Sequence, residues 1–282
     1  MRTAFVVPPH EGEFVTWGKD RAQVLATRAR TDEKYSFARV LVRGGGSFLE
    51  ARESAGIYVL RGGVGVASGT SSNALGAGDF VLVPKGAMIS LGVVGATPPD
   101  LVFVGAPAGE DPIPFEPAAG MASPDGPRIA IRRPGEGLLA ALAGDRYRVF
   151  AGAGETGGAF AMFEAFVQPG GGPPPHRHSR EEEAFYMLEG EITFRTEGKT
   201  FSGRPGFFVH LPVGGVHSFR NESDHAARML VLVAPGGLER MILEAGTPLS
   251  SEADPVPRPK ESDIARLLDV ARRYGVEILE PS

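Results

Sequence analysis

Three histidines and one glutamate in the second half of the chain have the spacing expected of metal ligands. His176 and His178 are separated by one residue, Glu183 follows shortly after, and His217 comes later. In an extended strand, side chains at positions i and i+2 point to the same face, so both imidazoles project into one space. A short turn through Ser179-Arg180 can return the chain so that Glu183 faces that space. Three neutral imidazoles and one carboxylate suit one divalent transition metal per chain, such as Fe, Mn, Ni, Co, Cu or Zn.

The ordinary alternative is that these histidines are hydrogen-bonded core residues, but the ligand types and their spacing favour a metal site. The role of His210, in the run FFVHLP, is left open: it lies either behind the ligands or elsewhere in the core or surface. Glu164 can line a cavity as an acid or base, or face outward, and we favour the outward orientation.

The elements that position these residues are predicted to be short strands. Hydrophobic residues make up 42% of the chain and charged residues 22%, with 39 glycines and 24 prolines placed between apolar runs such as GDFVLVPKG and GFFVHLPVG. Short apolar runs punctuated by Gly and Pro are typical of an all-β barrel or sandwich. We therefore expect a chain made mostly of β-structure.

The chain also repeats itself. The run Tyr58–Gly62 matches Tyr186–Gly190, and the later pairs Gly78/Gly206, Pro84/Pro212, Gly86/Gly214 and Pro107/Pro235 keep the same offset of 128 residues. The first repeat has Ile89 where the second has His217, and no histidine occurs between His10 and His176. The first repeat therefore lacks metal ligands, and is structural or binds something without metal.

These observations predict four segments. Residues 1–110 form an N-terminal barrel without metal ligands, 111–135 a Pro- and Gly-rich linker, 136–246 the metal-binding barrel, and 247–282 a tail. The tail contains ESDIARLLDVARRYG, with Ile264, Leu267, Leu268 and Ala271 at helical spacing, Ser262 as N-cap and Gly275 as stop. We expect one structural helix packed on the outside of a barrel.

Composition excludes several classes of function. The chain has no cysteine, which excludes disulfides, zinc–thiolate sites and thiol nucleophiles. Its net charge is −5 and its pI about 5.8, without a basic stretch, so nucleic acids and anionic membranes are not expected partners. Without a signal peptide or an apolar stretch long enough to cross a bilayer, we expect a cytoplasmic protein.

Two complete motifs carry a family resemblance. Gly170-x5-His176-x-His178-x4-Glu183-x6-Gly190 and Gly206-x5-Pro212-x-Gly214-x2-His217-x3-Asn221 resemble the two motifs of the cupins at every position. The resemblance implies two tandem cupin barrels (double-stranded β-helix, or jelly roll) in an all-β fold with a C-terminal α-helix. Glu182 is the alternative to Glu183 as ligand, since some cupins have one fewer residue before the glutamate.

The runs GDRYRVFAGAGETGGAF, GGGPPPHRHSREEEAFYMLEGEITF and ARRYGVEIL are similar to bacterial bicupins of the quercetin 2,3-dioxygenase type. The resemblance implies a dioxygenase that acts with O2 on an aromatic or enolic small molecule, with Glu183 as both ligand and catalytic base. The alternatives are a non-oxidative metal enzyme (isomerase, decarboxylase or lyase) and a binding protein without turnover. A homodimer is compatible with each of these functions. Strands flanking the ligands offer these candidate pocket residues: Phe160, Met162, Phe185, Met187, Phe207 and Phe219.

Overall fold

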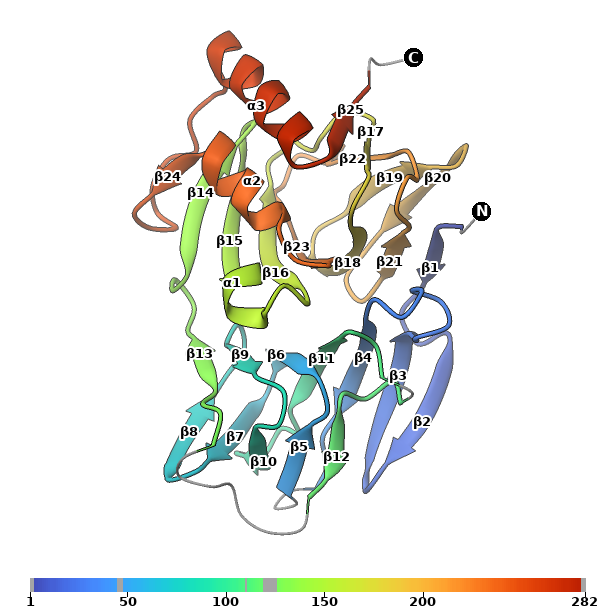
Figure 1. Cartoon of the computed structure of the whole chain (residues 1–282), viewed down its shortest axis with the longest axis vertical. Coiled ribbons are helices and arrows are strands. Elements are labelled where there is room, and N and C mark those ends of the chain that lie inside the picture. Colours follow the sequence, from blue (N-terminus) through green and yellow to red (C-terminus); the bar gives the residue numbers. More distant parts are fainter. Residues whose placement is uncertain (1–2, 45–47, 110, 119–125, 280–282) are drawn as a thin grey trace. The chain divides into compact units, whose positions relative to one another are not determined.

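A computed structural model describes residues 3–44, 48–109, 111–118 and 126–279. It consists mainly of β-strands (Figure 1) and divides into two compact units. We call His10–Glu136 the first barrel, and Met1–Pro9 together with Gly137–Ser282 the second barrel. Each is described by itself.

The second barrel has two antiparallel sheets. The larger sheet contains, in spatial order, β1 (Phe5–Val7), β21 (Phe208–Leu211), β18 (Glu182–Glu189), β23 (Ala227–Ala234), β16 (Ala161–Val167), β15 (Asp145–Ala151), β14 (Leu138–Leu142) and β24 (Thr247–Leu249). The smaller sheet contains β20 (Lys199–Gly203), β19 (Ile192–Thr196), β22 (His217–Arg220), β17 (His176–His178) and β25 (Val276–Ile278). Alternate residues of β16, such as Phe163 and Ala165, point into the core between the sheets.

The first barrel repeats this plan. Its larger sheet contains β13 (Ala130–Arg132), β9 (Phe80–Val83), β6 (Ser54–Arg61), β11 (Asp100–Ala106), β4 (Ser36–Leu41), β3 (Asp20–Ala26) and β2 (Glu13–Trp17). Its smaller sheet contains β12 (Phe115–Pro117), β5 (Phe48–Ala51), β10 (Met88–Val94), β7 (Gly63–Ser68) and β8 (Ser71–Leu75). The predicted all-β class with two tandem barrels is confirmed.

The predicted linker, residues 111–135, contributes strands to this unit. Residues 115–117 form β12 beside β5, and residues 130–132 form β13 beside β9. Residues 119–125 of that segment lie outside the described residues. The part of the linker that is described is therefore ordered by backbone pairing.

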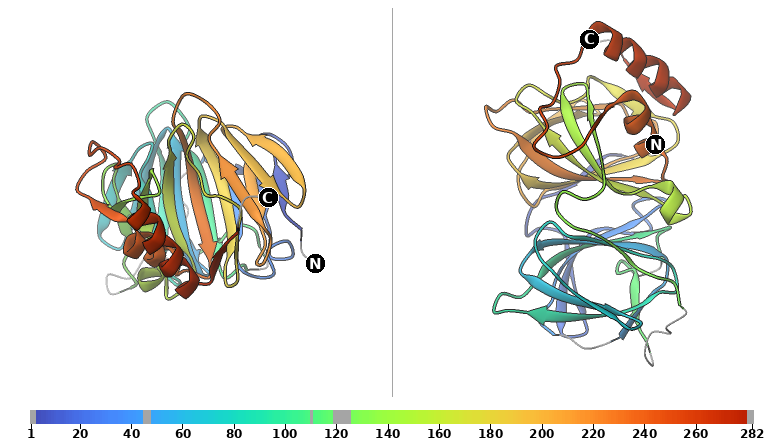
Figure 2. Two further views of the ribbon diagram at one scale, coloured as in Figure 1. Left: turned by 90° about the horizontal axis from the view of Figure 1, so that it is seen from above. Right: turned by 90° about the vertical axis from the view of Figure 1, so that its left-hand side faces the viewer.

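Three helices occur in the described residues, all in the second barrel: α1 (Ala153–Thr156), α2 (Leu238–Ala245) and α3 (Glu261–Arg273). The predicted C-terminal helix is confirmed as α3, and part of the predicted stripe faces inward: Ala271 is buried and Leu267 packs against the core. Ile264 and Leu268 of that stripe are instead 39% and 36% exposed, and Val270, outside the stripe, is buried. Figure 2 shows α3 beside α2 against the second barrel. No helix in the described ranges is long and apolar enough to span a membrane.

Candidate metal centre

Three strands bring the predicted ligands into the interior of the second barrel. β17 carries His176 and His178 on its buried face and exposes Arg177 between them, as the two-residue period requires. β18 supplies Glu183, and β22 supplies His217, whose backbone is paired directly with that of His176.

The four side chains form one buried cluster. Each is at most 6% exposed, and one ligand atom from each lies within 4.8 Å of those from the others. Oε2 of Glu183 lies 3.0 Å from Nε2 of His217 and 3.4 Å from Nε2 of His178. This arrangement suits a mononuclear site, since all four donors converge on one point.

Backbone carbonyls fix the orientation of two of the imidazoles. Nδ1 of His176 donates to the carbonyl oxygen of Pro174 at 2.9 Å, and Nδ1 of His217 donates to that of Gly215 at 3.0 Å. A carbonyl only accepts hydrogen bonds, so these contacts require a proton on Nδ1. In the neutral imidazole this leaves Nε2 with a lone pair for a metal ion, for which His217 would exchange its 3.0 Å contact with Oε2 of Glu183.

The charges of the cluster are strongly coupled. Burial opposes a charge on His178, but the carboxylates of Glu183 and Glu181 outweigh burial and raise the pKa of His178 to about 9. Burial and the neighbouring His217 and His178 lower the pKa of His176 to about 3. Burial favours the neutral acid of Glu183, yet His178 and His217 outweigh it and hold the pKa of this carboxyl well below its usual range.

The donor set fits a divalent metal ion. Both ring nitrogens of His178 are buried without a hydrogen-bond partner among the described residues, although carboxylates lie nearby. Buried polar atoms are normally hydrogen-bonded, so such atoms at a convergent site call for a ligand. A metal ion would take Nε2 and place Nδ1 beside Glu181, at 3.6 Å, in the supporting arrangement common for metal-bound histidines.

The alternative ligand Glu182 lies on the opposite face of β18. Its Oε2 is 2.9 Å from Nε2 of His210, and both side chains are fully buried. The ring of Phe5, on β1, stacks on His210 at 4.6 Å between centroids. Charged runs are usually solvated, but Glu181, Glu182 and Glu183 are all buried, because each has a histidine partner.

Glu164 likewise faces away from the core. Its carboxylate is fully buried and pairs with Arg148 and Arg228. It therefore belongs to an ion-pair network on the outer face of β16.

A glycine-rich loop held by Asp145 leads into β17. The Asp145 carboxylate accepts hydrogen bonds from the backbone N–H groups of Gln168 and Gly172, at 2.9 and 2.8 Å. A Cβ at Gly171 would collide with this carboxylate, and Gly172 has φ +108°. Burial raises the pKa of Asp145 to about 6, against the opposing effect of the two N–H donors.

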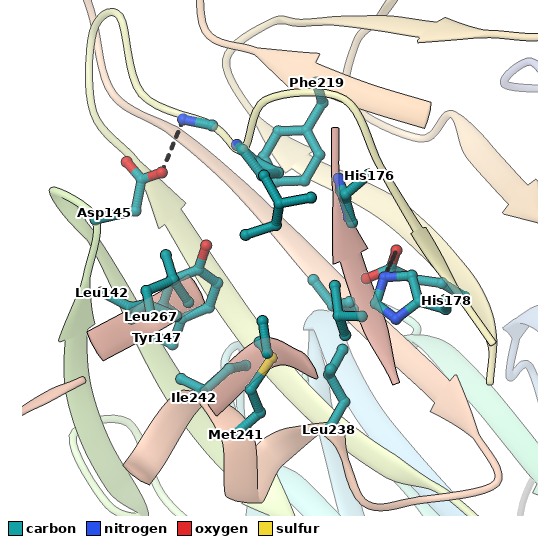
Figure 3. Close-up of a pocket in the computed structure, with 18 of the residues that line it drawn as sticks. Leu142, Asp145, Tyr147, His176, His178, Phe219, Leu238, Met241, Ile242 and Leu267 are labelled. Atoms are coloured by element: carbon teal, nitrogen blue, oxygen red, sulfur yellow. Dashed lines mark hydrogen bonds and ion pairs between the residues drawn. The ribbon is translucent and has the colours of Figure 1, made fainter. Parts of the chain in front are cut away.

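A cavity of about 100 Å³ opens beside His176, His178 and Glu183. Figure 3 shows the two histidines on one side and Asp145 and Tyr147 across from them. The predicted pocket residues Phe185 and Phe219 line this cavity. The described lining does not include the other four: Phe160, Met162, Met187 and Phe207. Phe160, Met162 and Met187 are fully buried, and Phe207 packs partly buried against the core.

The rest of the cavity wall was not foreseen from the sequence. α2 contributes Leu238, Met241 and Ile242, and α3 contributes Leu267. Tyr147 brings the only hydroxyl group of the described lining, and Figure 3 shows it directed into the cavity. Burial, with the charges of Asp145 and Glu183, raises the pKa of Tyr147 well above its usual value, so the hydroxyl remains a donor. The sequence does contain a signal for these two residues: the two-residue period of β15 places Asp145 and Tyr147 on the same face of the strand.

Comparisons with known proteins agree with this geometry. Residues 163–233 match the model of the cupin domain. The match lies within the second barrel. The chain is 28% identical over 158 residues to quercetin 2,3-dioxygenase of Bacillus subtilis (strain 168), a match that covers 56% of this chain and 46% of that protein. It is 33% identical over 82 residues to polyketide synthase CurC of Streptomyces cyaneus, covering 29% of this chain and 52% of that protein.

The chain spans about half the length of these curated relatives. A solved structure of Lactobacillus farciminis oxalate decarboxylase in a formate complex aligns with TM-score 0.59 at 12% identity. The alignment covers 82% of this chain and 86% of the decarboxylase chain, so the likeness in fold includes both barrels. The chain thus has a bicupin fold that resembles quercetin 2,3-dioxygenase-like proteins, as its motifs predict.

Proposed function

We propose that the second barrel is a mononuclear metal-dependent dioxygenase that acts with O2 on an aromatic or enolic small molecule. The observation that carries the proposal is the set His176, His178, Glu183 and His217, buried at one wall of an apolar cavity. The similarity to quercetin 2,3-dioxygenase supports the reaction class.

Three histidines and Glu183 would hold the ion. A redox-capable ion held there would supply Lewis-acid and one-electron chemistry toward an enolic substrate and O2. The chain's own contribution begins with His176 and His217, whose Nδ1 contacts with backbone carbonyls hold these two rings in position. Such preorganisation avoids rearrangement of the ligands during turnover.

Glu183 is both the carboxylate ligand and the candidate base. Glu183 lines the cavity, and the neighbouring histidines keep its carboxyl group ionised. An ionised carboxylate is the form that accepts a proton from a substrate hydroxyl.

The cavity would orient a flat substrate and exclude water. Apolar side chains from α2, α3 and several strands of both sheets form most of the wall. Tyr147 can donate a hydrogen bond to a polar substituent at the end of the substrate far from the metal ligands. Apolar walls with a few placed polar groups are the usual form of a small-molecule site.

The test combines metal analysis with oxygen uptake. Protein expressed with mixed divalent metals is analysed for metal content, reconstituted with Fe, Mn, Ni, Co or Cu, and assayed with flavonols, catechols and 1,3-diketones. We expect about one metal per chain and O2 consumption coupled to loss of one substrate class. A reconstituted, metal-loaded sample that consumes no O2 across the panel would disprove the dioxygenase.

A non-oxidative enzyme is the second candidate, because Glu183 presents a proton acceptor and Tyr147 a hydrogen-bond donor in one cavity. A carboxylate base can move a proton of an enolic substrate without O2, while the hydroxyl group holds a substrate oxygen. Turnover of a 1,3-diketone by the zinc-loaded protein under anaerobic conditions would favour this function.

A further inference from the structure

The first barrel contains a cavity larger than that of the metal centre. Its volume is about 420 Å³, and its apolar wall consists of Trp17, Val42, Leu49, Leu91, Ile113 and Phe115. Strands of both sheets contribute, so the cavity lies inside the barrel. Protein interiors are normally close-packed, and apolar cavities of this kind bind small aromatic molecules.

This cavity is the counterpart of the metal centre. β5 pairs with β10 as β17 pairs with β22, so Leu49 and Ile89 occupy the register of His176 and His217. Ala55 pairs with Val83 as Glu183 pairs with Leu211.

The wall of the cavity follows the same register. Phe115 and Pro117 of β12 stand where Val276 and Ile278 of β25 stand in the second barrel, and both pairs line their cavities. The cavity therefore occupies the same place in both barrels, and the first barrel has apolar side chains where the second has its candidate metal ligands.

Two further differences enlarge the cavity. Ala22, paired with Val40, occupies the register of Tyr147, which is paired with Ala165. The described part of the first barrel also has no counterpart of α2 and α3, whose side chains fill space in the second barrel. The first-barrel cavity therefore accepts a bulkier occupant.

Four charged residues line this cavity, two cationic and two anionic: Lys19, Arg52, Asp20 and Asp111. Arg52 donates to Asp111 at 2.8 Å and to Glu116 at 2.9 Å. Asp20 accepts from the backbone N–H groups of Arg43 and Gly44. Since these charges are balanced, the site favours an uncharged ligand whose hydroxyl groups reach the polar groups.

We propose that the first barrel binds an uncharged, planar phenolic molecule of about two rings, without a metal. Its volume falls within the range of roughly 300–1,000 Å³ typical of small-molecule sites. Trp17, whose ring meets the ring of Phe103 edge-on at 5.6 Å, offers an aromatic wall for stacking. The site is independent of the reaction proposed for the second barrel.

Trp17 is the only tryptophan of the chain, so its fluorescence reports on this cavity alone. The probe is 4-phenylphenol, which absorbs at shorter wavelengths than tryptophan emits and cannot quench by long-range energy transfer. Titration of chelator-treated protein is expected to shift Trp17 emission to saturation and to protect it from acrylamide quenching.

The variant Leu91→Phe fills the cavity with the side chain that the second barrel carries at the equivalent position, Phe219. We expect it to weaken binding about tenfold or more through overpacking. Leu49→Phe is a second filling variant, and Val94→Phe, at an exposed position of β10, is the matched control that should bind normally. Thermal unfolding checks that each variant is folded.

Two results would overturn the proposal. One is unchanged Trp17 emission and acrylamide quenching in wild-type protein up to the solubility limit of 4-phenylphenol. The other is unchanged affinity in whichever filling variant is folded, since the probe would then bind elsewhere. The wild-type titration decides the matter even if neither filling variant folds.

Discussion

His176 and His217 are direct cross-strand partners, with ring centroids 4.2 Å apart. The same register in the first barrel joins Leu49 to Ile89. This pair of strand positions supplies two candidate metal ligands in the second barrel and none in the first. The strand pairing at these positions is common to both barrels, and the side chains that it presents differ.

Removing His217 should remove the metal. His217→Ala deletes one of the four donors, and we expect metal affinity to fall by more than about tenfold, because changes even to supporting residues cost that much. Elemental analysis after dialysis measures the effect. The matched control is His225→Ala, which removes a histidine that is 87% exposed and far from any ligand role. Equal metal content in the two variants would contradict the assignment.

The two adjacent glutamates should behave differently when each is changed to glutamine. Glu183→Gln removes the ligand carboxylate and should lower metal affinity more than about tenfold. Glu182→Gln should keep the metal but lower the free energy of unfolding by about 1–3 kcal/mol, because its buried partner His210 loses a charged acceptor. Metal analysis and urea unfolding of both variants test this. Metal loss in Glu182→Gln alone would mean that β18 presents its other face.

The cluster of His176, His178, Glu183 and His217 could be predicted because local periodicity and turn positions bring these residues together. The two-residue period of a strand places His176 beside His178, and the motif glycines mark turns, with φ +76° at Gly170 and +74° at Gly190. The repeat could be recognised because the glycines and prolines of these turns recur at an offset of 128 residues.

The cavity wall could not be predicted in this way. Met241 and Leu267 reach the cavity through the packing of α2 and α3, which no local pattern encodes. Helical spacing predicted a stripe through Ile264, Leu267, Leu268 and Ala271. Ala271 and Leu267 do face inward, but Ile264 and Leu268 are exposed and Val270 is buried in their place. Nor could the sequence separate core residues from cavity residues: Phe160 and Met162 are apolar and buried, yet they do not line the cavity.

Asp145 should make stability depend on pH. Burial raises the pKa of Asp145 in the folded state to about 6, from about 3.8 when unfolded. Its favourable contribution is therefore fully present below the unfolded pKa and is lost as pH rises through about 6. The loss is on the order of 3 kcal/mol at 1.36 kcal/mol per pKa unit.

The variant Asp145→Asn has no such titration. We expect the free energy of unfolding of wild type, relative to this variant, to fall between pH 4 and pH 7 by roughly that amount. Urea unfolding at several pH values measures the difference. A difference that stays constant with pH would show that the carboxyl does not titrate in this range.

Tyr147 should contribute to substrate binding and not to metal binding. In Tyr147→Phe the hydroxyl is lost while the ring remains, so we expect KM to rise about two- to tenfold, the effect of one neutral hydrogen bond. Metal content should equal that of wild type. Oxygen-uptake kinetics with the active substrate class provide KM and kcat. An unchanged KM would exclude a hydrogen bond between this hydroxyl and the substrate.

The last strand should control how fast the metal leaves. β25 pairs with β17 along its whole length, and its Val276 and Ile278 line the cavity. A chain ending at Tyr274 lacks these pairs, so the strand that carries two histidines becomes an edge that opens more easily. We expect release of the metal to a chelator to be about tenfold faster, or more, than in wild type. Glu277→Ala removes only the exposed ion pair with Arg177 and should release the metal at nearly the wild-type rate, because exposed pairs contribute little. If the truncated chain stays folded and releases metal as slowly as wild type, the metal leaves by a route that β25 does not cover.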